Sequence, residues 1–229
     1  MKTVGIIGGL GPKTTSEFYL KIISECQRLN RVNRPPILIS NIPAPYNIER
    51  EAIEKGKGEE RFVPFLLRAA KQLERGGADF LVMPCNSLHY FIKDIKDSVK
   101  IPVLDIIGET TNFLKKKDIS KVGLISTSIT KKRRLYEKSF KSNGIELIVP
   151  NETQQKKIGE IIYRLVTGKH KDKDKKQLYD IIEYLNSKGA LNIVLACTDL
   201  QLLKPRHPKV KIYDTMKIFA EATVREILK

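Results

Sequence analysis

The sequence lacks the features that mark membrane and secreted proteins. No apolar run approaches the roughly 20 residues that a membrane-spanning helix requires, and only 3 of the 229 residues are cysteine. Three is an odd and low number, so it provides no disulfide framework and fits a reducing cytosol. The N-terminal segment MKTVGIIGGLGP has one lysine and a short apolar run that stops at glycines, which predicts a first strand and not a signal peptide. We therefore expect a cytoplasmic protein with no membrane segment.

Histidine and acidic residues are also scarce. The chain has 3 histidines, and no set of His, Cys, Asp and Glu has metal-ligand spacing, so no metal site is predicted. Against 42 Lys and Arg there are 26 Asp and Glu, which leaves a net charge of +16. Such a surplus suits nucleic acid or anionic metabolites in principle. The basic residues are dispersed without interleaved aromatics, however, and the densest cluster, residues 131–134, predicts a solvated helix face. Nucleic acid is therefore not the expected partner.

What the sequence does contain is a regular alternation of short apolar runs with amphipathic stretches. This pattern is typical of an α/β fold with mostly parallel strands. A long helix is predicted over residues 59–75, where Gly76-Gly77 ends it. The charged run KHKDKDKK at 169–176 predicts a solvated loop. Strands are predicted at residues 3–8, 36–40, 79–83, 101–104, 121–126 and 192–196.

The second half of the chain resembles the first. KVGLIS resembles the N-terminal KTVGII with an offset of 118 residues, and GALNIVLACT resembles GADFLVMPCN with an offset of 112 residues between their cysteines. Nearly equal offsets indicate an internal duplication. We therefore expect two pseudo-symmetric α/β domains with mostly parallel sheets. The first would span residues 1–112 together with an amphipathic C-terminal segment, 213–229, and the second residues 113–212.

Each half places one cysteine just beyond the carboxyl end of a predicted strand, where open α/β sheets bind their ligands. Asn-Ser follows Cys85 and Thr-Asp follows Cys197, so each thiol has two hydrogen-bonding neighbours at a helix start, a position that lowers the pKa of a thiol. Two facing thiols suggest one reaction. One thiolate removes a proton from a carbon acid while the opposite thiol supplies a proton to the other face, which inverts the stereocentre.

The segment Gly8–Pro12 joins the first predicted strand to a helix. It matches neither the G-x-G-x-x-G dinucleotide fingerprint nor a phosphate loop, because no Lys-Ser/Thr pair follows it. Two interpretations stay open: a tight turn that needs positive φ, or a turn whose backbone N–H groups hold a carboxylate at the helix N-terminus. The third cysteine, Cys26, has neither polar neighbours nor a repeat partner, so we expect it to pack in the core.

These motifs together resemble the cofactor-independent aspartate/glutamate racemases. The resemblance runs over nearly the whole chain and rests on VGIIGGLGP, on PCNS-x-H around Cys85, on VGLIST-x-x-T at 122–130 and on CTDL around Cys197. It implies an active site in the cleft between two similar α/β domains, a homodimer, and no pyridoxal phosphate or other cofactor. The implied activity is racemisation of an amino acid, with aspartate or glutamate as the expected acidic substrate.

The resemblance also implies roles for individual residues. Cys85 and Cys197 would be the paired acid and base, with His89 and Asp199 as possible supporting residues. Asp199 stands where Glu is common in the family. The residues expected to bind the substrate are Leu10, Arg50, Asn86, Ser87, Thr127 and Thr198.

The sequence departs from the family where the side-chain carboxylate would be held. In place of the Pro-Asp-Arg segment of aspartate-specific members, residues 42–50 read IPAPYNIER. Arg50 is the candidate from this segment, and Arg164 is the nearest match for a second basic residue.

Three alternatives remain at this point. A hydantoin racemase would explain the unmatched arginine, and a decarboxylase of malonate-like acids would need only one of the two thiols. A non-catalytic amino-acid or nucleic-acid binding protein would leave the cysteine pair unexplained.

Overall fold

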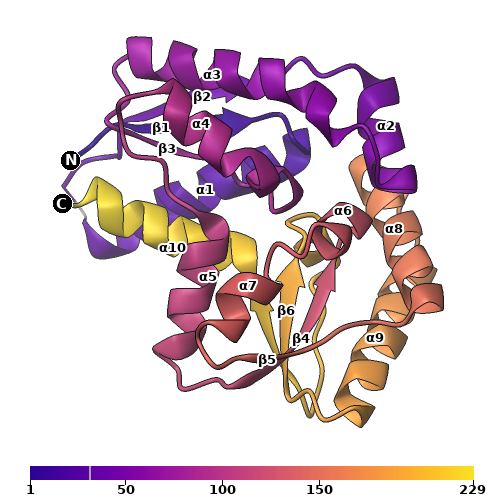
Figure 1. Ribbon diagram of the computed structural model, residues 1–229. Coiled ribbons are helices and arrows are strands. Elements are labelled where there is room, and N and C mark those ends of the chain that lie inside the picture. The colour runs from indigo at the N-terminus through magenta and orange to yellow at the C-terminus, as the bar shows by residue number, and fades with distance from the viewer. Residues whose placement is uncertain (31) are drawn as a thin grey trace.

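The computed structural model describes residues 1–30 and 32–229 and contains two parallel β-sheets, each flanked by helices (Figure 1). The expected α/β class with two parallel-sheet domains is therefore confirmed. The elements of the first half are β1 (Val4–Gly8), α1 (Pro12–Leu29), β2 (Ile37–Asn41), α2 (Tyr46–Lys55), η1 (Glu59–Phe62), α3 (Val63–Arg75), β3 (Phe80–Val82), η2 (Ser87–Phe91), α4 (Ile92–Ser98) and α5 (Ile106–Lys115). Those of the second half are β4 (Lys121–Ser126), α6 (Ser128–Lys132), α7 (Glu137–Lys141), β5 (Glu146–Ile148), α8 (Glu152–Val166), α9 (Asp172–Ser187), β6 (Asn192–Ala196), η3 (Leu200–Leu203), β7 (Lys211–Asp214) and α10 (Thr215–Ile227).

The two sheets have the same strand order. The first is β2-β1-β3 and the second is β5-β4-β6-β7, with parallel pairing throughout. In the first sheet the place of β7 is taken by a single parallel bridge between Leu81 and Val103. A full strand was expected at 101–104, but Pro102 has no N–H to donate to a ladder. The chain then turns directly into α5, which Asp105 caps by accepting from the Ile107 N–H.

Helix α10 joins the C-terminus to the first half. It packs against α1 and α5, and the Lys2 N–H donates to the Ile227 carbonyl at 2.9 Å, so the two chain ends lie close together (Figure 1). Phe18 of α1 stacks on Phe219 of α10 with ring centroids 5.7 Å apart. The buried cluster around this contact includes Val4 of the first sheet and Leu124 of the second. The halves therefore share one core, which fixes the position of one sheet against the other.

Separate buried clusters cover the outer faces of the sheets. Leu66 and Leu73 of α3 pack on the first sheet, and Ile158 of α8 and Ile181 of α9 pack on the second. Because buried apolar side chains recur at helical spacing in α3, α8 and α9, each presents one apolar stripe to its sheet. In the part of the chain that the structure describes, no helix is both long and apolar enough to cross a membrane.

The expectation of a solvated loop at residues 169–176 was wrong, because α9 begins at Asp172. Asp174 lies in the first turn of this helix, accepts from the Lys171 N–H and is fully buried. Its charge is balanced by Arg164 of α8, whose Nη2 lies 2.7 Å from Oδ1. Burial alone would raise the pKa of Asp174, but the Arg164 and Lys171 hydrogen bonds hold it below its ordinary value. Tertiary pairing thus buries Asp174 within a helix start whose other residues, 169–173 and 175–176, are exposed as expected.

The Arg164–Asp174 pair leads to a prediction about stability. We expect Arg164→Gln to lower the free energy of unfolding by about 3 kcal/mol at pH 7, because it leaves a buried carboxylate without its cation. The pKa of Asp174 is lowered by folding, so the pair stabilises the protein above the unfolded-state pKa and the contribution is lost as the pH falls. Urea unfolding at pH 7 and at about pH 3.5 would measure both effects. Glu160→Gln, which removes the exposed partner of Arg164, is the control and should cost less than about 0.5 kcal/mol; equal losses for the two variants would contradict the argument.

Candidate active site

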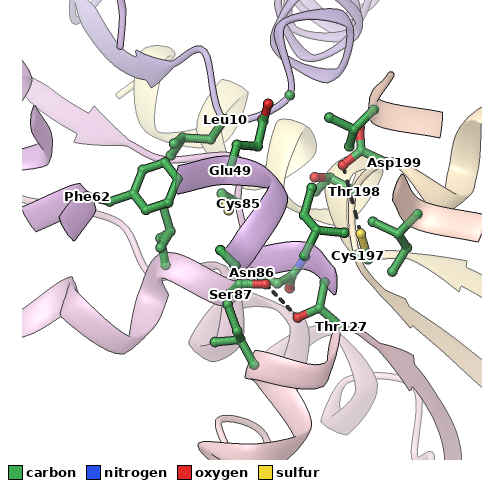
Figure 2. Close-up of a pocket in the computed structure, with 17 residues that line it drawn as sticks. Leu10, Glu49, Phe62, Cys85, Asn86, Ser87, Thr127, Cys197, Thr198 and Asp199 are labelled. Carbon is green, nitrogen blue, oxygen red and sulfur yellow. Dashed lines mark hydrogen bonds between the residues drawn. The ribbon is translucent and has the colours of Figure 1, made fainter. Parts of the chain in front are cut away.

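A pocket opens where the carboxyl ends of the two sheets meet, and it is lined by both halves of the chain (Figure 2). It contains both of the cysteines that follow strands, Cys85 and Cys197. The lining residues are Leu10, Gly11, Glu49, Ala52, Ile53, Phe62, Cys85, Asn86, Ser87, Leu88, Thr127, Ile129, Ile162, Val166, Cys197, Thr198 and Asp199.

Cys85 lies between the end of β3 and the start of η2. The backbone N–H groups of Ser87 and Leu88, at the start of η2, favour the thiolate and lower its pKa. Removal of water around the sulfur acts more strongly in the other direction, and the nearby carboxylates of Asp199 and Glu49 add to it. Together they raise the pKa of Cys85 to about 12. The side chain keeps part of its surface accessible, as a group that meets a substrate must.

Cys197 occupies the equivalent position in the second half, between the end of β6 and the start of η3. Burial, followed by the charge of Asp199, raises the pKa of this thiol well above its ordinary value, although the N–H groups of Asp199 and Leu200 oppose the shift. Its Sγ lies 3.9 Å from Oδ2 of Asp199, toward which the thiol can donate. Charge on Cys85 further raises the pKa of Cys197. The protein's own groups therefore favour the protonated form of both thiols at neutral pH, and ionisation of one disfavours ionisation of the other.

Neutral hydrogen-bonding groups from the two halves meet beside the thiols. The hydroxyl groups of Ser87 and Thr127 lie 2.7 Å apart (Figure 2). Thr127 also caps α6 by accepting from the Thr130 N–H. Across the pocket, the Thr198 hydroxyl donates to the Pro84 carbonyl at 3.2 Å. Because each pair joins opposite halves, these groups hold fixed positions before a substrate arrives.

Asn86 is buried and held by hydrogen bonds at both ends of its amide. Its Oδ1 accepts from the Tyr136 hydroxyl at 2.5 Å and its Nδ2 donates to the Thr215 hydroxyl at 3.1 Å. Thr215 in turn donates to the Leu195 carbonyl at 2.8 Å. All of these groups except the backbone carbonyl come from side chains that are at most 2% exposed. One N–H of the Asn86 amide remains for a ligand after these contacts.

Asp199 connects the second half to the start of α1. The Thr14 hydroxyl donates to its Oδ1 at 2.5 Å, at the N-terminal turn of the helix. Gly9 and Gly11 adopt φ of 83° and 85°, and a Cβ on Gly11 would stand 3.0 Å from Oδ1 of Asp199. The positive φ expected of the glycine turn is thus confirmed. The carboxylate at this helix start belongs to the protein, and its donor is the Thr14 hydroxyl, whereas the second interpretation had assigned backbone N–H groups of the turn. Burial raises the pKa of Asp199 to about 6, against the hydrogen bonds from Thr14 and Cys197.

Comparison with known proteins identifies the family. The Asp/Glu/hydantoin racemase family matches residues 7–223. The chain belongs to this racemase family. A broad specificity amino-acid racemase, RacX of Bacillus subtilis, is 28% identical over 230 residues, which cover 98% of each chain. Among solved structures, an aspartate racemase homologue from Pyrococcus horikoshii OT3 is 27% identical with a TM-score of 0.79 over the full length of both chains. The aspartate racemase of Picrophilus torridus is 25% identical with a TM-score of 0.78 over 100% of this chain and 95% of that one.

The resemblance to a racemase family is thus confirmed, and with it the expectation of an enzyme of the isomerase class. Of the residues expected in the racemase site, the structure brings eight together in the pocket: Leu10, Cys85, Asn86, Ser87, Thr127, Cys197, Thr198 and Asp199. Arg50 and His89 are not among the residues that line it.

Arg50 faces a neighbouring cavity instead, together with Tyr46 and Tyr163, and this cavity shares Glu49, Ile53 and Val166 with the first pocket. Its guanidinium carbon lies over the Tyr163 ring, 5.9 Å from the centroid. The reason is the phase of α2, which presents Glu49, Ala52 and Ile53 to the racemase pocket at i, i+3 and i+4. Residue 50 is one step further along, about 100° around the helix. The sequence pattern pointed to Arg50 and not to Glu49. Helical spacing places Glu49 on the same face as Ala52 and Ile53, so this spacing was the signal for Glu49.

His89 lies behind Cys85 in this racemase. Its Nδ1 donates to the Cys85 carbonyl at 2.6 Å, and its Nε2 accepts from the Ile106 N–H at 3.2 Å. This arrangement requires the neutral ring, and burial lowers the pKa of His89 further. The histidine does not supply positive charge to the thiolate. It positions the backbone of Cys85.

The described residues contain no group of three or more His, Cys, Asp or Glu that could hold a metal ion. The pocket's polar atoms are hydroxyls, an amide, two thiols and two carboxylates. Such a set can orient a small polar molecule and move protons.

The raised pKa of Asp199 predicts a gain in stability when its charge is removed. Folding raises this pKa from 3.8 to about 6, so the ionised carboxylate destabilises the fold, and stability is lost as the pH rises through 6. Asp199→Asn should therefore raise Tm by about 5 °C at pH 8, since the Thr14 hydroxyl can donate to the amide oxygen. At pH 4 we expect no gain. Thermal melts across this range test the prediction against Asp180→Asn, an exposed acid on α9; a pH-independent effect of Asp199→Asn would contradict it.

Proposed function

We propose that this protein is an amino-acid racemase that needs no pyridoxal phosphate, with Cys85 and Cys197 as its two proton-transfer groups. One observation carries the proposal: the two thiols occupy equivalent positions in pseudo-symmetric halves and line one pocket. A stereocentre inverts when a proton leaves one face of the carbon and another arrives on the opposite face. Two related sites that face a common substrate suit this reaction.

The proton balance of the reaction is closed within the thiol pair. A thiolate on one cysteine takes the α-hydrogen as a proton, and the electron pair stays on the α-carbon and its carboxylate. The thiol of the other cysteine then donates its proton to the opposite face. The enzyme ends with thiolate and thiol exchanged, which is the form that accepts the product enantiomer. Solvent protons restore the starting form.

The neutral groups around the thiols are placed to stabilise the developing carbanion. The remaining N–H of the Asn86 amide can donate to the substrate carboxylate, on which negative charge grows in the transition state. In the Ser87–Thr127 pair one hydroxyl donates to the other, so the accepting hydroxyl keeps its own proton for the substrate. These donors are already fixed by contacts between the halves, so little reorganisation is needed when the charge develops.

Substrate binding also offsets the electrostatic cause of the raised thiol pKa values. The carboxylates of Asp199 and Glu49 oppose ionisation of Cys85. An α-ammonium group that binds beside Asp199 brings a positive charge into the same pocket and favours the thiolate. The reactive form is thereby produced mainly when an amino acid is present.

The proton-transfer groups do not by themselves determine which substrate side chain the pocket accepts. The sequence led us to expect aspartate or glutamate with Arg50 as the carboxylate ligand, but Arg50 faces the neighbouring cavity. Hydantoins, which the family name also includes, have no ammonium group to balance the two pocket carboxylates. We therefore favour α-amino acids as the substrates, in keeping with the broad specificity stated for the Bacillus subtilis relative.

The two-thiol mechanism predicts that each cysteine is required. Cys85→Ser and Cys197→Ser should each lower kcat/KM for racemisation by about 10³-fold, because a hydroxyl is a far weaker acid than a thiol and its anion is scarcer. Polarimetry, with α-hydrogen exchange in D₂O as a second readout, measures this. Cys26→Ala is the matched control, since Cys26 is buried in the core of α1 away from the pocket, and it should stay within about twofold of the wild type. Full racemisation by either serine variant would exclude the mechanism.

The raised thiol pKa values also predict a pH dependence. Below its pKa the thiolate fraction of a group grows about tenfold with each pH unit. With both thiols protonated at neutral pH, kcat/KM should rise with pH between about 6.5 and 8.5, where the substrate's α-ammonium stays largely protonated. A flat profile over this range would mean that a thiolate already exists in the free enzyme.

A further inference from the structure

The charged side chains that line the pocket are all acidic. Two carboxylates, Glu49 and Asp199, line it, and among the described residues around the pocket there is no Lys, Arg or His. A site for a dicarboxylic amino acid needs a cation or several strong donors for the second carboxylate, because an unpaired buried anion is costly. This pocket would instead place a substrate carboxylate near carboxylates of the protein.

The basic residues near the site are engaged elsewhere. Arg133 pairs with the buried Glu59, with Nη2 2.6 Å from Oε1, and its guanidinium lies over the Tyr90 ring at 4.4 Å. Arg164 pairs with Asp174 between α8 and α9. Arg50 lies over Tyr163 in the neighbouring cavity, which Glu49 also lines, but Arg50 is not among the residues that line the first pocket. Recruiting Arg133 or Arg164 for a substrate would leave a buried carboxylate without its cation, which costs several kcal/mol.

The two pocket carboxylates differ in how they are held. Asp199 is fixed by Thr14 and lies beside the Cys197 thiol, so it belongs to the reaction centre. Glu49 comes from α2 in the other half. In the described part of the chain its carboxylate has neither a hydrogen bond nor an ion pair, although the residue is only partly exposed. Burial, followed by the charge of Asp199, raises its pKa. A cation beside Glu49 would oppose both causes by favouring the ionised carboxylate.

An apolar surface lies next to Glu49. Ala52 and Ile53 follow it on the same face of α2, Phe62 adds an aromatic ring, and Ile162 and Val166 of α8 complete this part of the pocket. Figure 2 shows Glu49 and Phe62 on the side of Leu10, with Cys197 and Asp199 across the pocket. A chain of methylene groups would bury well against such a surface, whereas a short side chain with a charged end near the α-carbon would not use it.

We infer that Glu49 binds the side-chain cation of a basic amino acid, with an aliphatic stem such as that of lysine or ornithine packed against the apolar surface. This assignment rests on the proposed racemase function and names its substrate class. Asp199 receives the α-ammonium group and Glu49 the terminal ammonium group, so each carboxylate of the pocket is balanced by one positive charge of the substrate. Glu49 is thus the residue that determines specificity.

The test compares three amino acids that differ at the end of the side chain. L-lysine has a terminal ammonium, L-norleucine has the same length without it, and L-glutamate has a carboxylate. Racemisation by polarimetry, together with α-hydrogen exchange in D₂O, gives kcat/KM for each. We expect lysine to exceed norleucine by about 10- to 100-fold, the range of one hydrogen bond to a charged group, and glutamate to be the poorest of the three.

Two variants of Glu49 and one control isolate its contribution. Glu49→Gln should reduce the lysine-to-norleucine ratio of kcat/KM to near one, and Glu49→Lys should raise the glutamate-to-norleucine ratio above that of the wild type. Glu60→Gln removes one negative charge from an exposed side chain of η1 outside the pocket, and should leave both ratios unchanged.

The test separates failure of the proposed racemase function from failure of the Glu49 assignment. If none of the three amino acids exchanges its α-hydrogen, and a wider panel of amino acids gives the same result, the proposed racemase function is wrong. If racemisation occurs but norleucine or glutamate equals or exceeds lysine, the function stands and the assignment of Glu49 is overturned. The wild-type ratios decide this point even if a Glu49 variant does not fold. A preference for lysine that persists unchanged in Glu49→Gln would also overturn the assignment.

Discussion

The hydrogen bond between Thr14 and Asp199 is the contact on which the site depends most directly. It joins the first helix of one half to Asp199, which lies two residues after Cys197 in the other half. The close approach is possible because Gly11 has no Cβ and adopts positive φ. Without this contact the two carboxyl edges would be joined beside the thiols only by weaker pairs such as Ser87–Thr127 and Thr198–Pro84, together with the shared core beneath them.

The charged groups of the same region lower the stability of the fold. At neutral pH the two carboxylates with raised pKa values, Asp199 and Glu49, cost folding free energy. The raised thiol pKa values do not, because a thiol is protonated at this pH in the unfolded chain as well. The cost is met elsewhere, by the core that α1 and α10 share and by the covering helices of each sheet. A pocket of this kind is prepared for a ligand that carries positive charge, because such a ligand relieves the repulsion that the fold imposes.

Much of the architecture followed from local patterns. Buried parallel strands are continuous apolar runs, so β1, β4 and β6 could be predicted nearly to the residue, and the repeat around Cys85 and Cys197 indicated two equivalent strand ends. Local patterns did not predict the features that depend on contacts between residues far apart in the sequence. The run at 169–176 is polar throughout, yet Arg164 allows Asp174 to be buried at a helix start. Likewise Arg50 matched the expected chemistry, but the helix phase turns it away from the pocket.

The sequence by itself determined the α/β class, the internal repeat and the pair of cysteines at equivalent strand ends, because these depend on residue type and on short spacing. Only the tertiary structure decided which charges share the pocket. Glu49 and Asp199 are 150 residues apart, and they come together because α10 and the common core set one half against the other. The electrostatic character of the site, and with it the substrate that it can accept, is therefore a property of how the halves are packed.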